Sequence, residues 1–202
     1  VHRADLQRAL LSAIAERPEI ELTTGATITA VSHTSGSARV ALELPQARPR
    51  TVEADLAVAA DGVWSVLRRT LAGGTAARFV GRVAWRRTIP ADMAALRALT
   101  PDMAVGAFLS PRFHLVCYPI RDGREINLVA FTPGGRVAED WSVAADPTPL
   151  VAALASCAPV LAELAQDGTG WTAHPLHVVE PGQRWTAGRL ALIGDAAHAL
   201  TP

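Results

Sequence analysis

The sequence predicts an α/β protein in which a layer built on parallel strands is interrupted by an inserted mixed β-sheet. Two apolar runs, residues 55–60 and 189–193, each end beside a paired Asp and Gly and continue into a helical pattern. Such runs are typical of strands buried on both faces of a parallel sheet. Between them, four strand-like runs follow one another, which predicts a second sheet. Half of the 202 residues are hydrophobic, so the chain can bury about 70% of its unfolded surface.

The first 53 residues predict one helix and a small antiparallel sheet. Apolar residues recur at helical spacing over residues 4–16, and Pro18 ends that helix. Glycines and prolines then separate four short strand patterns, and this region predicts a three-stranded antiparallel unit. These strands are expected at residues 20–22, 27–33, 38–44 and 51–53.

The rest of the chain predicts the inserted sheet and a return to the first layer. A helix over residues 64–71 precedes the insert, whose strands are expected at residues 79–89, 104–109, 113–120 and 125–131. Two Ala-rich helices follow, at 149–156 and 159–166, each with Pro at a tolerated starting position. The expected domains are therefore residues 1–76, the insert at 77–178, and the return at 179–202.

Composition and charge exclude several classes of protein. Nineteen basic residues balance 19 acidic ones and form no basic stripe, which argues against binding of nucleic acid. The most apolar stretch, residues 150–165, is shorter than the roughly 20 residues that a membrane span needs. Cys117 and Cys157 make neither a disulfide framework nor a metal knuckle, so we expect a reducing compartment, the cytoplasm.

Two places share one arrangement, in which Asp61-Gly62 and Gly194-Asp195 each follow an apolar strand and precede a helix. Open α/β sheets bind ligands at the carboxyl ends of their strands. There an Asp can accept hydrogen bonds from sugar hydroxyls, a Gly lets the backbone approach the ligand, and a helix N-terminus favours phosphate. A cofactor with a ribityl chain and phosphates fits these groups. For either pair alone, a helix-capping Asp beside a turn-forming Gly is an equally good interpretation.

The sequences around these pairs resemble a known family. DLAVAADGVWSVLRR, residues 55–69, is similar to the Asp-Gly motif of the class A FAD-dependent aromatic monooxygenases, and GRLALIGDAAHALTP, residues 188–202, to their Gly-Asp motif. This is the family of salicylate hydroxylase and para-hydroxybenzoate hydroxylase. The opening VHRADLQRAL, the segment at 81–90 and the strand pair at 113–131 resemble further parts of it. The resemblance implies an FAD-binding Rossmann-like layer, partial here, with an inserted substrate domain.

The resemblance also implies which residues bind the cofactor. They are Arg3 beside the flavin, Asp61, Gly62, Ser65 and Arg68 at the FAD and NAD(P)H pyrophosphate region, Gly194 and Asp195 at the ribityl hydroxyls, and Pro202 near the isoalloxazine ring. The family's Gly-rich phosphate loop and the glycines that follow its proline have no counterpart in these residues. We therefore expect an internal fragment, opening at Val1, that by itself neither retains FAD nor is active.

The substrate side is expected on one face of the strand at 113–120. Alternation places His114 and Tyr118 on one face of that strand and Cys117 on the other. In the family that this chain resembles, one face of this sheet covers the aromatic substrate, so His114 and Tyr118 are expected to hydrogen-bond a ring hydroxyl or carboxylate. A partly buried core tyrosine is an equally good interpretation of Tyr118.

Other patterns predict no chemistry. The G-x-G-x-x-A pattern that starts at Gly168 has no strand before it and Pro175 after it, so it lacks the context of a dinucleotide motif. His174 and His177 have no Cys or carboxylate nearby, so we expect them in a strand and expect no metal site. No Ser has Gly at both −2 and +2, which excludes the nucleophile elbow of α/β-hydrolases.

The activity that the resemblance implies is hydroxylation of a small aromatic substrate with NAD(P)H and dioxygen, in which the cofactor performs the chemistry. An FAD-dependent reductase or epoxidase on the same scaffold is one alternative. A non-catalytic fragment without cofactor is the other. The sequence favours no particular oligomeric state.

Overall fold

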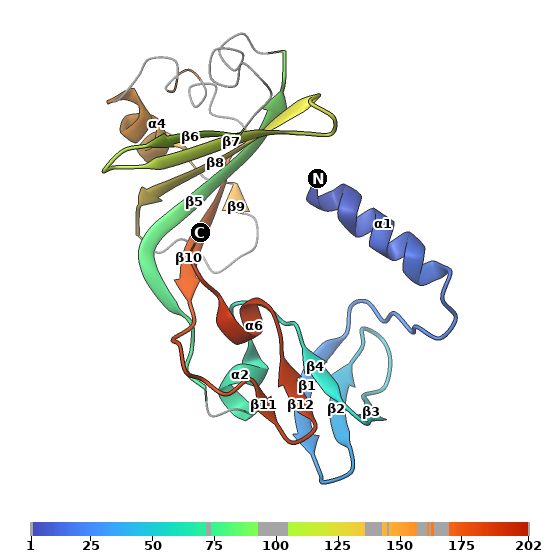
Figure 1. Cartoon of the computed structure of the whole chain (residues 1–202). Helices are drawn as coiled ribbons and strands as arrows, with labels where there is room; N and C mark the ends of the chain where they lie inside the picture. Colours follow the sequence, from blue (N-terminus) through green and yellow to red (C-terminus); the bar gives the residue numbers. More distant parts are fainter. Residues whose placement is uncertain are drawn as a thin grey trace. The chain divides into compact units, whose positions relative to one another are not determined.

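The computed structural model of the chain describes residues 2–71, 74–92, 105–135, 143–144, 146–156, 161, 163 and 170–201. The chain divides into two compact units (Figure 1). The six-stranded unit comprises Val1–Ala13 and Gly81–Leu176, and the parallel unit comprises Ile14–Val80 and His177–Pro202.

The six-stranded unit is built on one sheet with the order β6-β7-β8-β5-β10-β9. Its strands are β5 (Arg78–Pro90), β6 (Gly106–Leu109), β7 (His114–Ile120), β8 (Glu125–Pro133), β9 (Val143–Ala144) and β10 (Thr172–Val178). The pairs β6–β7, β7–β8, β5–β8 and β9–β10 are antiparallel. The four-residue connection between β7 and β8 turns sharply, with positive φ at Arg121, Asp122 and Gly123.

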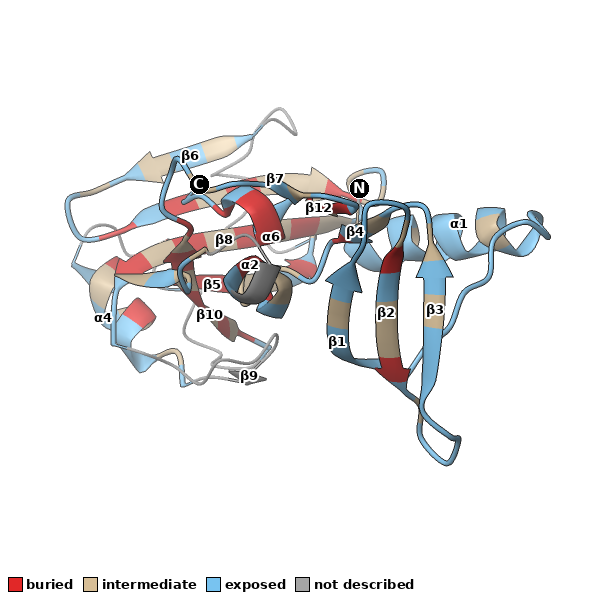
Figure 2. Ribbon diagram, turned by 90° about the horizontal axis from the view of Figure 1, so that it is seen from below, coloured by how far each residue is buried: buried red, intermediate tan, exposed pale blue. Residues whose placement is uncertain are grey.

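The core of this unit lies between one face of the sheet and helix α4 (Thr148–Ala155). Alternate residues of β7 and β8 point into it, among them Leu115, Cys117 and Leu128, all nearly inaccessible to solvent. Figure 2 shows these buried positions in red along the central strands. The period-two pattern of the sequence thus selects which side chains enter the core and which face away from it.

Helix α1 (Arg3–Ala15) joins this unit through ion pairs at its first turn rather than through apolar packing. Its leucines Leu6, Leu10 and Leu11 are exposed. Asp5 accepts hydrogen bonds from Arg121 Nε at 2.9 Å and from Nη2 at 3.3 Å. Arg121 also donates to Glu125 at 2.9 Å, so one guanidinium joins the helix to the hairpin.

The parallel unit contains two small sheets. The antiparallel sheet has the order β1-β2-β3, and the other has the order β11-β12-β4. Its elements are β1 (Thr27–His33), β2 (Ala38–Glu43), β3 (Arg50–Ala54), β4 (Ala57–Ala59), α2 (Val66–Leu71), β11 (Thr186–Ala187), β12 (Leu190–Leu192) and α6 (Asp195–His198). Leu67 of α2 and Ala197 of α6 pack on Ala59 and Leu192.

Most elements that the sequence predicts are present, including the antiparallel unit and the inserted sheet. The strand expected at residues 20–22 is wrong, because that segment has no strand pairing. Burial of both faces of the parallel strands is also wrong, since Val58 and Ile193 are each 50% exposed. The helix expected at 159–166 lies mostly outside the described residues. Within the described part of the chain, every helix is too short or too polar to cross a lipid bilayer.

Candidate functional site

The two Asp/Gly pairs lie at one edge of a parallel strand pair. Strands β4 and β12 run parallel, with Ala57 opposite Leu190 and Ala59 opposite Leu192. The chain leaving β12 stays paired for one more residue, since Ile193 N donates to Ala59 O at 3.0 Å. Parallel strands that end in register bring their following residues to the same edge. Asp61-Gly62 and Gly194-Asp195 are therefore neighbours, although more than 130 residues separate them in the sequence.

Both glycines adopt backbone conformations that other residues avoid. Gly62 has φ of 79°, and Gly194 has φ of 57° with ψ of −142°. These positive φ values carry a steric penalty for a residue with a Cβ. No atom of the described chain lies within 4 Å of the position that a Gly194 Cβ would occupy. The backbone there faces open space into which a ligand can come close.

The two aspartates differ in what they bind. Asp61 Oδ2 accepts a hydrogen bond from Val66 N, 3.1 Å away, at the start of α2. The carboxylate of Asp195 is exposed and has no hydrogen bond or ion pair with the described residues. Helix capping thus accounts for Asp61, whereas the Asp195 carboxylate is free to accept hydrogen bonds from a ligand.

Ser65 and Arg68 hold the loop that follows β4. Ser65 Oγ is fully buried and accepts a hydrogen bond from Arg68 N, 3.0 Å away, as the N-cap of α2. Arg68 is 1% exposed, and its guanidinium donates to four backbone carbonyls. The acceptors are Val63 O at 2.6 Å, Ala196 O at 2.8 Å, Thr75 O at 3.1 Å and Asp195 O at 3.4 Å. This arginine therefore ties the Asp-Gly loop to the Gly-Asp helix.

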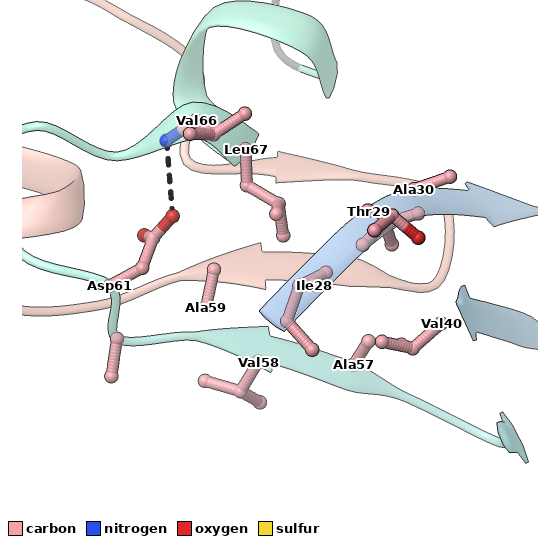
Figure 3. Close-up of a pocket in the computed structure, with 12 residues that line it drawn as sticks. Ile28, Thr29, Ala30, Val40, Ala57, Val58, Ala59, Asp61, Val66 and Leu67 are labelled. Carbon is pink, nitrogen blue, oxygen red and sulfur yellow. Dashed lines mark hydrogen bonds between the residues drawn. The ribbon is translucent and has the colours of Figure 1, made fainter. Parts of the chain in front are cut away.

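A largely apolar pocket of about 710 Å³ opens beside Asp61, between β1, β2 and β4 (Figure 3). Ile28, Val40 and Leu67 contribute side chains to its wall, and Asp61 lies toward one end. Asp61 is the only ionisable residue among the described residues that line it. Because its carboxylate is turned to Val66 N, the pocket suits an apolar group better than a charged one.

The second group of candidate residues lies on the sheet face opposite α4. Here His114 of β7 is exposed and Tyr118 is partly exposed, whereas Cys117 points into the core. Tyr118 is in register with Asn127 of β8, which is in turn in register with Thr88 of β5. Burial raises the pKa of the Cys117 thiol, so this side chain stays protonated and inert.

Sequence reasoning missed Arg86 and set His174 aside, and both lie on this same face. Thr172 Oγ1 lies 3.0 Å from His174 Nε2 and 3.3 Å from the backbone oxygen of Arg86. Burial lowers the pKa of His174, and the charges of Arg86 and Arg3 lower it further. The period-two alternation along β5 could have identified Arg86 from the sequence, because it puts Arg86 on the face opposite the core residue Trp85.

The other predicted residues are placed as follows. Arg3 is exposed in the first turn of α1, and its charge lowers the pKa of Arg86. Pro202 lies outside the described residues. His177, which was considered as a metal ligand, packs edge-on against Trp64 with ring centroids 5.9 Å apart. No cluster of three or more potential metal ligands occurs among the described residues.

Known proteins share this sequence pattern over its whole length. A family model described as FAD binding domain matches residues 1–202. The chain is 29% identical to a 3-hydroxybenzoate 6-hydroxylase of Klebsiella oxytoca, over 99% of this chain and 49% of the relative. It is 32% identical to a 3-amino-4-hydroxybenzoate 2-monooxygenase of Streptomyces platensis, over 100% of this chain and 49% of the relative. The chain thus spans about half the length of the curated relatives it matches.

Solved structures share the fold as well. A salicylate hydroxylase substrate complex superposes with a TM-score of 0.79 and 25% identity, covering 100% of this chain and 52% of that one. The protein HpxO of Klebsiella pneumoniae, complexed with FAD and uric acid, superposes with a TM-score of 0.76 and 27% identity, covering 100% and 49%.

Proposed function

Because the chain belongs to the FAD binding domain family, we propose that it forms part of an FAD-dependent monooxygenase that hydroxylates a small aromatic substrate with NAD(P)H and dioxygen. The observation that carries the proposal is the edge of the β4–β12 pair. It combines the Asp195 carboxylate, which has no partner among the described residues, with the Gly194 backbone, which no described atom crowds. The names of the relatives, which are hydroxylases and monooxygenases of hydroxybenzoates, supply the substrate class.

The residues of this edge fit the sugar part of FAD. Asp195 would accept hydrogen bonds from the ribityl hydroxyls, which are charge-assisted and therefore strong. Gly62 and Gly194 would let the backbone approach the cofactor closely. Ser65 and Arg68 have no free polar atoms to offer, so they would act on the pyrophosphate region through the loop that they hold.

The chemistry divides between cofactor and protein. When bound, FAD supplies the redox chemistry, with NAD(P)H as reductant and dioxygen as oxidant. The chain would bind and orient: Arg3 beside the flavin, Pro202 near its ring, and His114 and Tyr118 at the ring substituents of the substrate. No protein nucleophile is required for this reaction.

The experiment that tests the proposal uses the complete natural polypeptide that contains this chain. Purification should yield a flavin spectrum, and NAD(P)H oxidation with ¹⁸O₂ and hydroxybenzoates should give products that contain one labelled oxygen. NAD(P)H oxidation with no labelled product would instead identify a reductase, and a labelled epoxide would identify an epoxidase. Absence of bound flavin would refute the proposal.

Asp195→Ala in the same polypeptide tests the cofactor site. We expect flavin retention to fall, because the substitution removes a charged acceptor worth about 1.5–3 kcal/mol, or roughly ten- to a hundredfold in Kd for FAD. Glu180→Ala is the matched control, since Glu180 is an exposed carboxylate of the same unit that pairs with Arg78. An unchanged Kd in folded Asp195→Ala protein would mean that Asp195 only starts helix α6.

A further inference from the structure

The polar face of the six-stranded sheet, which is the face opposite α4, contains one arginine without a partner. The polar face comprises Ala84, Arg86, Thr88, His114, Val116, Tyr118, Glu125, Asn127, Val129, Phe131, Thr172 and His174. Arg86 lies on β5, between β8 and β10, and is half-buried. Its Nε is buried and has no hydrogen-bond partner. No carboxylate of the described residues forms an ion pair with its guanidinium.

The charges around Arg86 leave its positive charge uncompensated. Burial lowers the pKa of Arg86, and Arg3 lies close enough to lower it further. Burial and the charges of Arg86 and Arg3 lower the pKa of His174, so His174 is neutral and brings no charge to this face. Two acids of this unit, Asp5 and Glu125, are both occupied by Arg121 at 2.9 Å. Arg3 and Arg86 repel each other, and neither forms an ion pair with an acid among the described residues, so the pair favours the entry of an anion.

The surroundings of Arg86 match a planar aromatic acid. Val129 is in register with both Arg86 and Val116, so two apolar side chains line the face beside the guanidinium. Tyr118, one row further along, contributes a hydroxyl, and His174 contributes a neutral ring nitrogen. A guanidinium presents parallel N–H donors that fit both oxygens of a carboxylate.

We propose that Arg86 binds the carboxylate of an aromatic acid substrate on the polar face and thereby selects acids over neutral aromatics. This inference rests on the proposed function and adds to it a residue that determines specificity. Tyr118 and His174 contact the same molecule as neutral hydrogen-bonding groups, and Val116 and Val129 contact its ring.

Equilibrium dialysis of the FAD-loaded complete polypeptide tests the role of Arg86 in substrate binding without turnover. The probes are 3-hydroxybenzoate and its neutral isostere 3-hydroxybenzamide. We expect the acid to bind at least about tenfold more tightly than the amide, since only the acid forms charge-assisted hydrogen bonds. Arg86→Gln should abolish this preference and leave the flavin content unchanged, and Arg86→Lys should retain part of it.

Arg87→Gln is the matched control. Arg87 is the next residue in β5, points to the opposite face and lies over the ring of Trp171 at 5.9 Å. It should keep the preference for the acid. Melting temperatures of all variants separate misfolding from lost binding.

The outcomes are distinct from those that test the proposed function. Wild-type protein without a preference for the acid, or Arg86→Gln with the full preference, overturns the inference even where labelled oxygen still enters the product. The inference is also overturned if millimolar inorganic phosphate displaces both probes and the protein does not prefer 3-hydroxybenzoate to 3-hydroxybenzamide. Arg86 would then bind a phosphate group and not the carboxylate of an aromatic acid. Loss of the preference for the acid in Arg86→Gln, with the preference retained in Arg87→Gln, supports the inference.

Discussion

Arg68 shows how a single buried side chain can connect segments that are far apart in the sequence. Its guanidinium donates to Val63 and Thr75 on one side and to Asp195 and Ala196 on the other. Leaving a buried backbone carbonyl without its hydrogen-bond donor raises the free energy of the folded state, because water cannot reach the carbonyl to replace the donor. The role of Arg68 in this loop is therefore structural, whatever ligand the loop binds.

Arg68→Lys should lower the free energy of unfolding by more than about 3 kcal/mol, because a lysine cannot serve four carbonyls in the planar geometry of the guanidinium. Chemical denaturation monitored by Trp fluorescence measures the change. Arg69→Lys, at the neighbouring exposed position, should change stability by less than about 0.5 kcal/mol. Equal effects of the two variants would contradict the structural role of Arg68.

Tyr118 and Cys117 are adjacent residues on opposite faces of β7. Tyr118→Phe in the complete polypeptide should lower kcat/KM about two- to tenfold and leave the FAD content intact, since one neutral hydrogen bond of about 0.5–1.5 kcal/mol is lost. Steady-state kinetics on hydroxybenzoates measures this effect.

Cys117→Ser provides the contrast to Tyr118→Phe. Cys117 is fully buried in the core, so a hydroxyl there should lower the melting temperature and leave kcat/KM of the folded fraction unchanged. Full activity of Tyr118→Phe combined with loss of turnover in thermally stable Cys117→Ser would mean that the faces were assigned the wrong way round.

At the scale of elements, the attachment of α1 to the β7–β8 hairpin depends on ionised carboxylates. The hydrogen bond from Arg121 lowers the pKa of Asp5 below its usual value of 3.8, and the charge of Arg121 adds to this effect. A depressed carboxylate pKa stabilises the folded form above the unfolded pKa, and this contribution disappears as the pH falls through the folded pKa. The contact is therefore at full strength at neutral pH.

The difference in unfolding free energy between wild type and Asp5→Asn should be constant from pH 7 to about pH 5 and should shrink toward zero below about pH 3.8. Urea denaturation at a series of pH values measures it. Asp122→Asn is the control, because that side chain is 96% exposed and lies 3.7 Å from Arg124. An Asp5→Asn difference as large at pH 2.5 as at pH 7 would show that charge does not hold the helix.

At the scale of the whole molecule, the two units have cores of very different size. The core of the six-stranded unit includes Trp85, Phe113 and Leu128, whereas the parallel unit buries mainly small side chains around Ala59 and Leu192. Free energies of local opening follow the amount of buried apolar surface. The parallel unit should therefore open at lower free energy than the six-stranded unit.

Native-state hydrogen exchange of the 202-residue chain tests this, with slower exchange expected in β7 and β8 than in β4 and β12. Leu128→Ala, at a fully buried position, should lower the protection of the six-stranded unit by about 2–5 kcal/mol and leave β1 and β2 unchanged. Equal loss of protection in both units would show that they unfold as one.

The sequence by itself determined most of the elements and the residues that belong to each face of β7. Alternation in β7 separated His114 and Tyr118 from Cys117, and the Asp-Gly and Gly-Asp pairs identified the ends of two parallel strands. Such patterns are local, because a strand repeats every two residues and a turn depends on two or three neighbours. The family resemblance then supplied the cofactor and the reaction.

Only the tertiary structure decided what each polar group contacts. It showed that Asp61 caps α2 while the Asp195 carboxylate has no partner among the described residues, and that Arg68 reaches carbonyls 127 and 128 residues away. It also showed that Arg86 Nε is buried without a hydrogen-bond partner in the described part of the chain. It also removed the strand expected at residues 20–22, which finds no pairing partner. The physical reason is that hydrogen bonds, ion pairs and strand pairs need two groups in contact, and the second group lies in a part of the chain that local patterns do not specify.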